Sequence, residues 1–234
     1  SVAFGTHALI QKGVTFKELS LVVVDEQHRF GVRQRLALRS KGDAPDLLVM
    51  TATPNPRSLA LTVYGDLDVG YLRERPGRGG RNHVTTRIIA RSGRGEAYDA
   101  VRAAVRAGHR AYVVCALVDE SDASQAKAAT SEARRLQRSV FPDLKVGLLT
   151  GAMKSADKRA VMESFRRGDI DVLVATTVIE VGVDVPEATL MIVEDAERFG
   201  LAQLHQLRGR VGRGESPGEV LLFADPKTAD GCAR

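Results

Sequence analysis

Residues 203–214 read Gln-Leu-His-Gln-Leu-Arg-Gly-Arg-Val-Gly-Arg-Gly, so that Arg208, Arg210 and Arg213 are interleaved with glycines. A guanidinium group presents a planar fork of donors that fits phosphate oxygens in pairs. Glycine lets the backbone approach a ligand closely. The pattern therefore favours a clamp on a polyphosphate. The alternative is a solvated basic turn, which is what most short Arg/Gly runs are, and the stretch alone leaves both interpretations open.

Composition sets the class of protein. The 234 residues are 44% hydrophobic and 27% charged, which suits one large or two small globular domains. No apolar run approaches the ~18 residues of a membrane span, and no secretory leader is visible. Cys115 and Cys232 form neither a disulfide framework nor a metal-binding spacing. We therefore expect a cytoplasmic protein without membrane contact. The net charge of +5 is compatible with nucleic acid but is weak support for it.

Short apolar runs alternate with helical patterns along the chain, and no internal repeat is visible. We predict strands over 21–24, 47–50, 84–90, 111–118, 146–149, 172–175, 190–193 and 220–223. Helices are predicted over 32–40, 57–64, 96–107, 126–140 and 155–167, the last with Ser155 as N-cap and Gly168 after its end. This alternation predicts an α/β fold with parallel sheets covered on both faces. The Pro/Gly/Arg-rich stretch around Pro76 breaks the pattern. It predicts a linker over 74–83 between domains 1–73 and 84–234.

Polar residues follow several of the predicted strands. Ligands of parallel sheets bind beyond the carboxyl ends of the strands, and Asp25, Thr51 and Thr176 all follow such ends. Two adjacent carboxylates, Asp25 and Glu26, can divide the work of phosphoryl transfer. One holds Mg²⁺, usually through water, and the other orients or deprotonates the attacking water. Acidic residues that merely end a strand are the alternative.

Five stretches in order resemble motifs of the superfamily 2 helicases. Residues 5–10 resemble motif Ib, Asp25-Glu26-Gln27-His28 motif II, Thr51-Ala52-Thr53-Pro54 motif III, and residues 175–186 motif V. Gln206-x-x-Gly209-Arg210-x-Gly212-Arg213 resembles motif VI. Within the superfamily, residues 16–32, 47–65 and 169–214 resemble the RecG family of bacterial branch-migration helicases. The transcription-repair coupling translocases are close to it, but their motif II usually reads Asp-Glu-Glu-Gln. Gln27-His28 therefore favours the RecG family.

The resemblance implies two RecA-like lobes with parallel sheets, the first truncated at its N-terminus, and the cofactors ATP and Mg²⁺. It implies that Asp25 serves Mg²⁺, that Glu26 is the catalytic base, and that Arg210 and Arg213 act on ATP held by the opposite lobe. The other implied roles are nucleotide contact for Gly182, Asp184 and Gln206, coupling for Gln27, His28, Thr51 and Thr53, and DNA contact for Thr6, His7, Lys154 and Thr176.

The sequence also departs from the family. Thr150 and Ala152 replace a usual His and Arg, Asn55 replaces a usual Ile, and no Gly-x-x-x-x-Gly-Lys-[Ser/Thr] phosphate loop is present. In the family, that loop and a DNA-splitting wedge lie upstream. The chain has no initial Met, so we expect it to be part of a longer protein.

The resemblance implies a monomeric ATP-dependent helicase or translocase motor that acts on double-stranded and branched DNA. Stalled forks and Holliday junctions would be its substrates, in DNA repair and recombination. Two alternatives stay open. One is a transcription-repair coupling motor, and the other is a nucleic-acid-binding fragment without catalysis, since the phosphate loop is absent. ATP turnover separates the last from the others.

Overall fold

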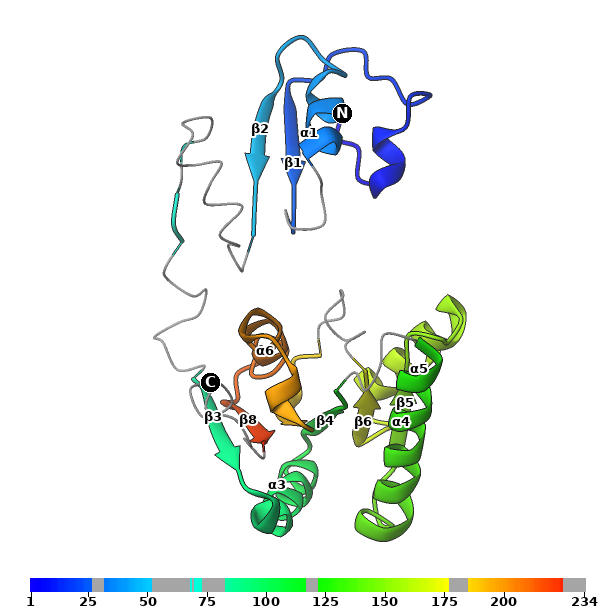
Figure 1. Cartoon of the computed structure of the whole chain (residues 1–234), viewed down its shortest axis with the longest axis vertical. Coiled ribbons are helices and arrows are strands. Elements are labelled where there is room, and N and C mark those ends of the chain that lie inside the picture. Colours follow the sequence, from blue (N-terminus) through cyan, green and yellow to red (C-terminus); the bar gives the residue numbers. More distant parts are fainter. Residues whose placement is uncertain are drawn as a thin grey trace. The chain divides into compact units, whose positions relative to one another are not determined.

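The structure is a computed structural model that describes residues 1–26, 32–51, 68, 70–72, 83–116, 122–176 and 185–224 (Figure 1). The chain splits into two compact units, Ser1–Arg73 and Glu74–Arg234. The predicted helix over 57–64 and the predicted linker, apart from His83, lie outside the described residues. Each unit is described by itself.

The first unit contains a parallel pair of strands, β1 (Leu21–Val24) and β2 (Asp46–Val49), with helix α1 (Val32–Arg39) and the 3₁₀ helix η1 (His7–Ile10). Val22, Val24 and Leu38 form its small core. The opposite face of the sheet, with Leu21 and Val23, is about half exposed. Helix α1 and η1 pack on the other face. Because the predicted helix over 57–64 lies outside the described residues, coverage on both faces stays a prediction for this sheet.

The second unit is a six-stranded sheet in the order β3-β8-β7-β4-β6-β5, and every pair in it is parallel. Its strands are β3 (Val84–Ile89), β4 (Arg110–Val114), β5 (Val146–Leu149), β6 (Val172–Ala175), β7 (Ala188–Val193) and β8 (Gly218–Phe223). The parallel α/β prediction is confirmed. Strand β4 ends at Val114, earlier than predicted, because its neighbours β6 and β7 end at the same level.

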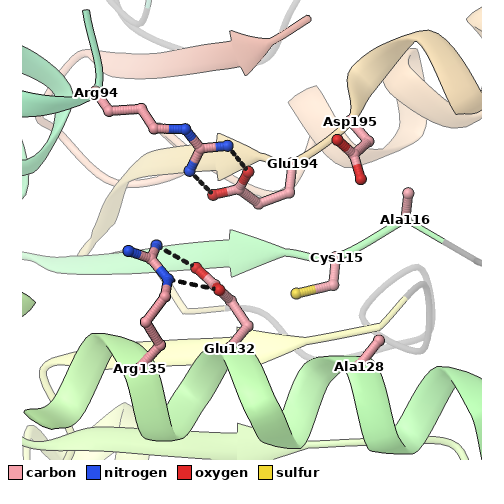
Figure 2. Close-up of a pocket in the computed structure, with 8 residues that line it drawn as sticks. All are labelled: Arg94, Cys115, Ala116, Ala128, Glu132, Arg135, Glu194 and Asp195. Atoms are coloured by element: carbon pink, nitrogen blue, oxygen red, sulfur yellow. Dashed lines mark hydrogen bonds and ion pairs between the residues drawn. The ribbon is translucent and has the colours of Figure 1, made fainter. Parts of the chain in front are cut away.

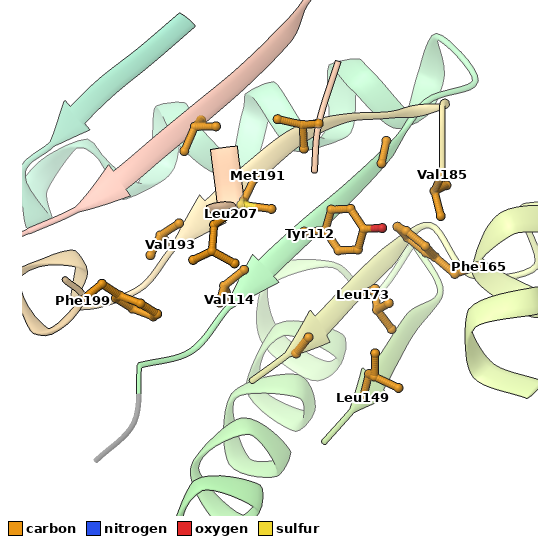
Figure 3. Packing of buried hydrophobic residues seen from close by; sticks show 14 of the residues in the cluster. Tyr112, Val114, Leu149, Phe165, Leu173, Val185, Met191, Val193, Phe199 and Leu207 are labelled. Carbon is orange, nitrogen blue, oxygen red and sulfur yellow. The ribbon is translucent and has the colours of Figure 1, made fainter. Parts of the chain in front are cut away.

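Helices cover both faces of this sheet. On one face lie α3 (Arg94–Arg106), which follows the short η3 (Arg91–Gly93), and α4 (Asp122–Arg135), which continues into a π-helical turn η4 (Leu136–Val140). On the other face lie α5 (Ser155–Arg167) and α6 (Leu201–Arg208), which follows the 3₁₀ turn η6 (Ala196–Arg198). Figure 3 shows the second core, where Phe165 of α5 packs on Tyr112 and Leu207 of α6 lies beside Met191. All residues of β6 and β7 are buried.

Two details of the predicted helices are wrong. The N-cap of α5 is Lys154 rather than Ser155, because the backbone is already helical at Ser155 and no side chain caps the helix. Helix α6 has no counterpart in the prediction. The end of α5 is as expected, since Gly168 adopts the left-handed conformation (φ 86°) and closes the last turn.

A short module occurs twice, although the sequence shows no repeat at first sight. Each copy has a strand ending in Val, two acidic residues, Arg-Phe-Gly two residues later, and a helix with Gln in its first turn and Leu-Arg at or near its end. The copies run from Val24 to Arg39 and from Val193 to Arg208 without insertion. The second acidic residue is left-handed in both, with φ 52° at Glu26 and 47° at Asp195. The two copies therefore share a sequence pattern and this backbone feature, and Arg39 and Arg208 hold equivalent positions in them.

Candidate nucleotide and nucleic-acid sites

The acidic pair follows the carboxyl end of β1, as predicted. Asp25 is exposed, and its Oδ1 accepts a hydrogen bond of 2.9 Å from the backbone N–H of Glu26. A left-handed conformation is uncommon for a residue such as Glu26, and backbone strain of this kind gathers at functional sites. The N–H of Met50 donates to the carbonyl of Val24 (2.8 Å), which places Thr51 at the same edge. Gln27, His28 and Thr53 lie outside the described residues.

The arginine loop (residues 209–214) lies at the amino edge of the sheet of the second unit, where its parallel strands begin. Gly212 donates its N–H to the carbonyl of Ala188 at 3.1 Å, and its Cα lies against Gly218 and Val84. These three partners are the first residues of β7, β8 and β3. Helix α6 has therefore carried the chain from the carboxyl end of β7 back to the amino edge of the second sheet.

The three arginines differ in what they contact. Arg208 is half-buried, and its Nη2 donates to the carbonyl of Val84 at 3.0 Å. Arg213 is exposed, and its Nε donates to the carbonyl of Gly209 at 2.7 Å. Arg210 and Gln206 are half-buried beside them. Arg208 thus serves the fold, so the clamp of three arginines is reduced to two candidates, Arg210 and Arg213.

The other candidates of the second unit meet at the carboxyl edge. Thr176 follows β6, and its N–H donates to the carbonyl of Leu149, the last residue of β5, at 3.2 Å. Lys154 lies in the exposed turn that follows β5. Thr176 is only 2% exposed and Thr150 is 4% exposed, so the Lys154 side chain is exposed to solvent and those of the two threonines are not. Gly182 and Asp184 lie outside the described residues.

Thr6 and His7 are exposed at the start of η1. The Oγ1 of Thr6 accepts a hydrogen bond from the N–H of Ala8 at 3.5 Å, as an N-cap does. The ammonium group of Lys41 donates to the carbonyls of Gln11 and Val14, at 2.8 and 2.6 Å. Lys41, at the end of α1, therefore ties the candidate DNA segment to the first unit, a role that sequence reasoning missed.

A pocket of about 470 Å³ opens at the carboxyl ends of β4 and β7, and two bidentate ion pairs line it (Figure 2). Arg94 of α3 binds Glu194, and Arg135 of α4 binds Glu132. Both guanidinium groups also donate to the hydroxyl of Tyr98. The network joins both helices to β7, so we interpret the pocket wall as structural.

Burial shifts the pKa of two groups that line this pocket. It raises the pKa of the Glu194 carboxyl, although Arg94 opposes the shift. It also raises the pKa of the buried Cys115 thiol far above its ordinary value. Cys115 therefore stays protonated and is a poor nucleophile. Among the residues that the structure describes, no group of three or more His, Cys, Asp or Glu side chains could hold a metal ion.

Comparison with known proteins identifies the family. The model of the helicase conserved C-terminal domain matches residues 96–215, about half of the chain. The chain belongs to this helicase family. The resemblance to the RecG family is also confirmed. The chain is 50% identical to the ATP-dependent DNA helicase RecG of Synechocystis over 226 residues, 97% of this chain and 27% of that protein. It is 53% identical to RecG of Escherichia coli K12 over 233 residues, 96% of this chain and 33% of that protein.

Solved structures agree with this assignment. A RecG structure described as bound to a three-way DNA junction superimposes with a TM-score of 0.72 at 46% identity, over 98% of this chain and 29% of that one. Yeast Dbp5, at 15% identity and a TM-score of 0.66, shares the fold alone. This chain spans about a third or less of the length of the RecG relatives it matches. No helix among the described residues is long and apolar enough to cross a membrane.

Proposed function

We propose that this chain is the motor region of an ATP-dependent DNA helicase or double-stranded DNA translocase of the RecG type. Its parent protein would remodel stalled forks and Holliday junctions in repair and recombination. Support comes from the ordered motifs, from relatives that are named as ATP-dependent DNA helicases, and from the relative that was solved on a three-way junction.

The observation that carries this proposal is the location of the arginine loop. A strand rises about 3.3 Å per residue, so the two ends of β8 are on the order of 16 Å apart. This is farther than an arginine side chain reaches. Arg210 and Arg213, at the amino edge, are therefore too far from the carboxyl edge of their own sheet to serve a ligand there. The motif resemblance implies ATP as the ligand on which these two arginines would act.

The proposed division of work follows from the chemistry of each side chain. Asp25 is exposed and has only one oxygen engaged by the Glu26 N–H, so its carboxylate fits a water-mediated contact to Mg²⁺, which usually keeps several waters. When bound, Mg²⁺ would neutralise charge on the phosphates. Glu26 would accept a proton from the attacking water, and Arg210 and Arg213 would bind the charge that develops on the phosphoryl group.

Other roles are proposed from the motif positions. Gly182, Asp184 and Gln206 would contact the nucleotide, while Gln27, His28, Thr51 and Thr53 would couple nucleotide state to DNA movement. Lys154, Thr6 and His7 would address the DNA backbone. Thr176 would reach it only after a local rearrangement, because its side chain is buried.

The test is ATP turnover by a full-length protein that contains this chain. We expect Arg213→Ala to leave ATP binding largely intact and to lower turnover roughly 10³-fold or more, as for other arginine fingers. Arg213→Lys should rescue little, because an ammonium group lacks the planar fork. Arg39→Lys, at an exposed arginine, is the matched control and should have no effect. Near-normal turnover with lysine at 213 would refute the finger role.

A further inference from the structure

Arg208 is the arginine of residues 203–214 that the proposed chemistry leaves unused. It is the last residue of α6 and lies immediately before the arginine loop. Its guanidinium donates to the carbonyl of Val84, the first residue of β3. The Arg213 bond stays within the arginine loop, whereas the Arg208 bond reaches a strand 124 residues earlier in the chain, so only the Arg208 bond can anchor the loop to the sheet. It is not the paired contact that an arginine makes with phosphate.

The same place holds several other contacts of the loop. Gly218 donates its N–H to the carbonyl of His83 at 3.2 Å. Gly212 packs against both Gly218 and Val84, where an added Cβ would meet backbone atoms at 2.9 to 3.0 Å and the Val84 side chain at 3.1 Å. His83 is the last residue of the predicted linker, so the loop is fastened to the point where the chain enters the second sheet.

We propose that Arg208 is a positioning residue, which fixes the arginine loop to the start of β3 and so sets where Arg210 and Arg213 are held. The inference rests on the proposed function, because it assumes that these two arginines act on ATP. It assigns Arg208 no contact with the nucleotide. A misplacement on the order of 1 Å can lower a rate about 100-fold, so one lost anchor is enough to matter.

The duplicated module supplies a matched control. Arg39 holds the equivalent position at the end of α1, where it is exposed. Arg39→Met and Arg208→Met remove the same charge from the same place in the two copies. If the anchor matters, only the change at 208 affects turnover.

The experiment uses a full-length protein that contains this chain, with DNA and ATP-Mg²⁺ at saturation. We expect Arg208→Met to lower single-turnover ATP hydrolysis about 10- to 100-fold, while ATP affinity and melting temperature change little. Arg208→Lys keeps one donor for the Val84 carbonyl and should retain most of the activity. This is opposite to the expectation at Arg213, where lysine fails. If Arg208→Met does not fold, the lysine variant still decides the matter.

A double variant separates positioning from a general loss of structure. If Arg208 acts only through the loop, Arg208→Met should lower turnover less in the Arg213→Ala background than in the wild type, because only the placement of Arg210 is left to lose. Fully multiplicative losses, or a lysine variant as poor as methionine, would overturn the inference and return Arg208 to a direct role. Normal turnover by Arg208→Met would also overturn it. If Arg213→Ala itself turned over normally, the proposed function would be the part that failed.

Discussion

Gly212→Ala is the most informative single change for the arginine loop. Gly212 has φ +66°, and the left-handed region costs an L residue roughly 1–2 kcal/mol. The new Cβ would also lie 2.9 Å from the Gly218 nitrogen and 3.1 Å from a Val84 methyl group. Overpacking of this kind costs about 1–3 kcal/mol. The two contributions together amount to roughly 2–5 kcal/mol.

Gly108→Ala separates the two contributions. Gly108 also has a left-handed φ, +84°, but nothing lies within 4 Å of the position where its Cβ would be. This variant therefore carries only the backbone cost, roughly 1–2 kcal/mol. The difference between the two variants, about 1–3 kcal/mol, measures the contact between the loop and the two strand starts.

Thermal unfolding of the chain followed by far-UV circular dichroism would measure this difference. About 1 kcal/mol corresponds to about 2–4 °C for a unit of this size. Gly212→Ala should therefore melt about 2–12 °C below Gly108→Ala. In the full-length protein, only Gly212→Ala should also lower ATP turnover. Equal melting temperatures with equal turnover would show that the loop does not rest on Gly218 and Val84 as the structure has it.

Three further predictions concern the motor. Residues 1–234 alone should show no DNA-stimulated ATP hydrolysis, because no phosphate loop is present to cradle the β- and γ-phosphates; measurable stimulated turnover would contradict this. Glu26→Gln in the full-length protein should bind ATP and keep it, in a DNA-bound state, since an amide does not accept the proton; unchanged single-turnover kinetics would remove Glu26 from the base role. A motor with lobe one completed but no wedge should bind forked and linear duplex almost equally, with affinity falling by about 0.9 log units per log unit of salt for each phosphate neutralised; a tenfold fork preference, about 1.4 kcal/mol, would place junction recognition in these residues.

The parts of the fold that the sequence predicts well are those whose signal is local. Strands β6 and β7 are continuous apolar runs because every residue in them is buried. The end of α5 is visible because Gly168 follows it. Helix α6 escapes prediction because it is only eight residues long and Leu207 is its one buried residue. The Arg/Gly pattern after it also suggests an irregular loop.

In the candidate site, too, the positions that follow from local sequence could be predicted and those that depend on distant partners could not. Asp25 and Thr51 could be placed at a carboxyl edge from the strand ends alone. The direction of Arg208 could not, because its partner Val84 lies 124 residues earlier in the chain. The location of Arg210 and Arg213 at the amino edge of the sheet, however, could have been predicted from the sequence. A helix between two parallel strands must return the chain to the amino edge, and the repeated Arg-Phe-Gly would have revealed such a helix after β7.

The pairing of β3 with β8 has a consequence for biogenesis. Among the described residues, these are the first and last strands of the second unit, and they pair along their whole length, from Val84 opposite Gly218 to Ile89 opposite Phe223. During synthesis, β3 must wait as an unpaired edge until the ribosome has released β8, and long-range parallel pairing of this kind is slow. The arginine loop rests on the starts of both strands. It therefore takes its place only after β8 has paired, so that nascent chains halted before β8 would lack a formed arginine loop even if the other four strands had assembled.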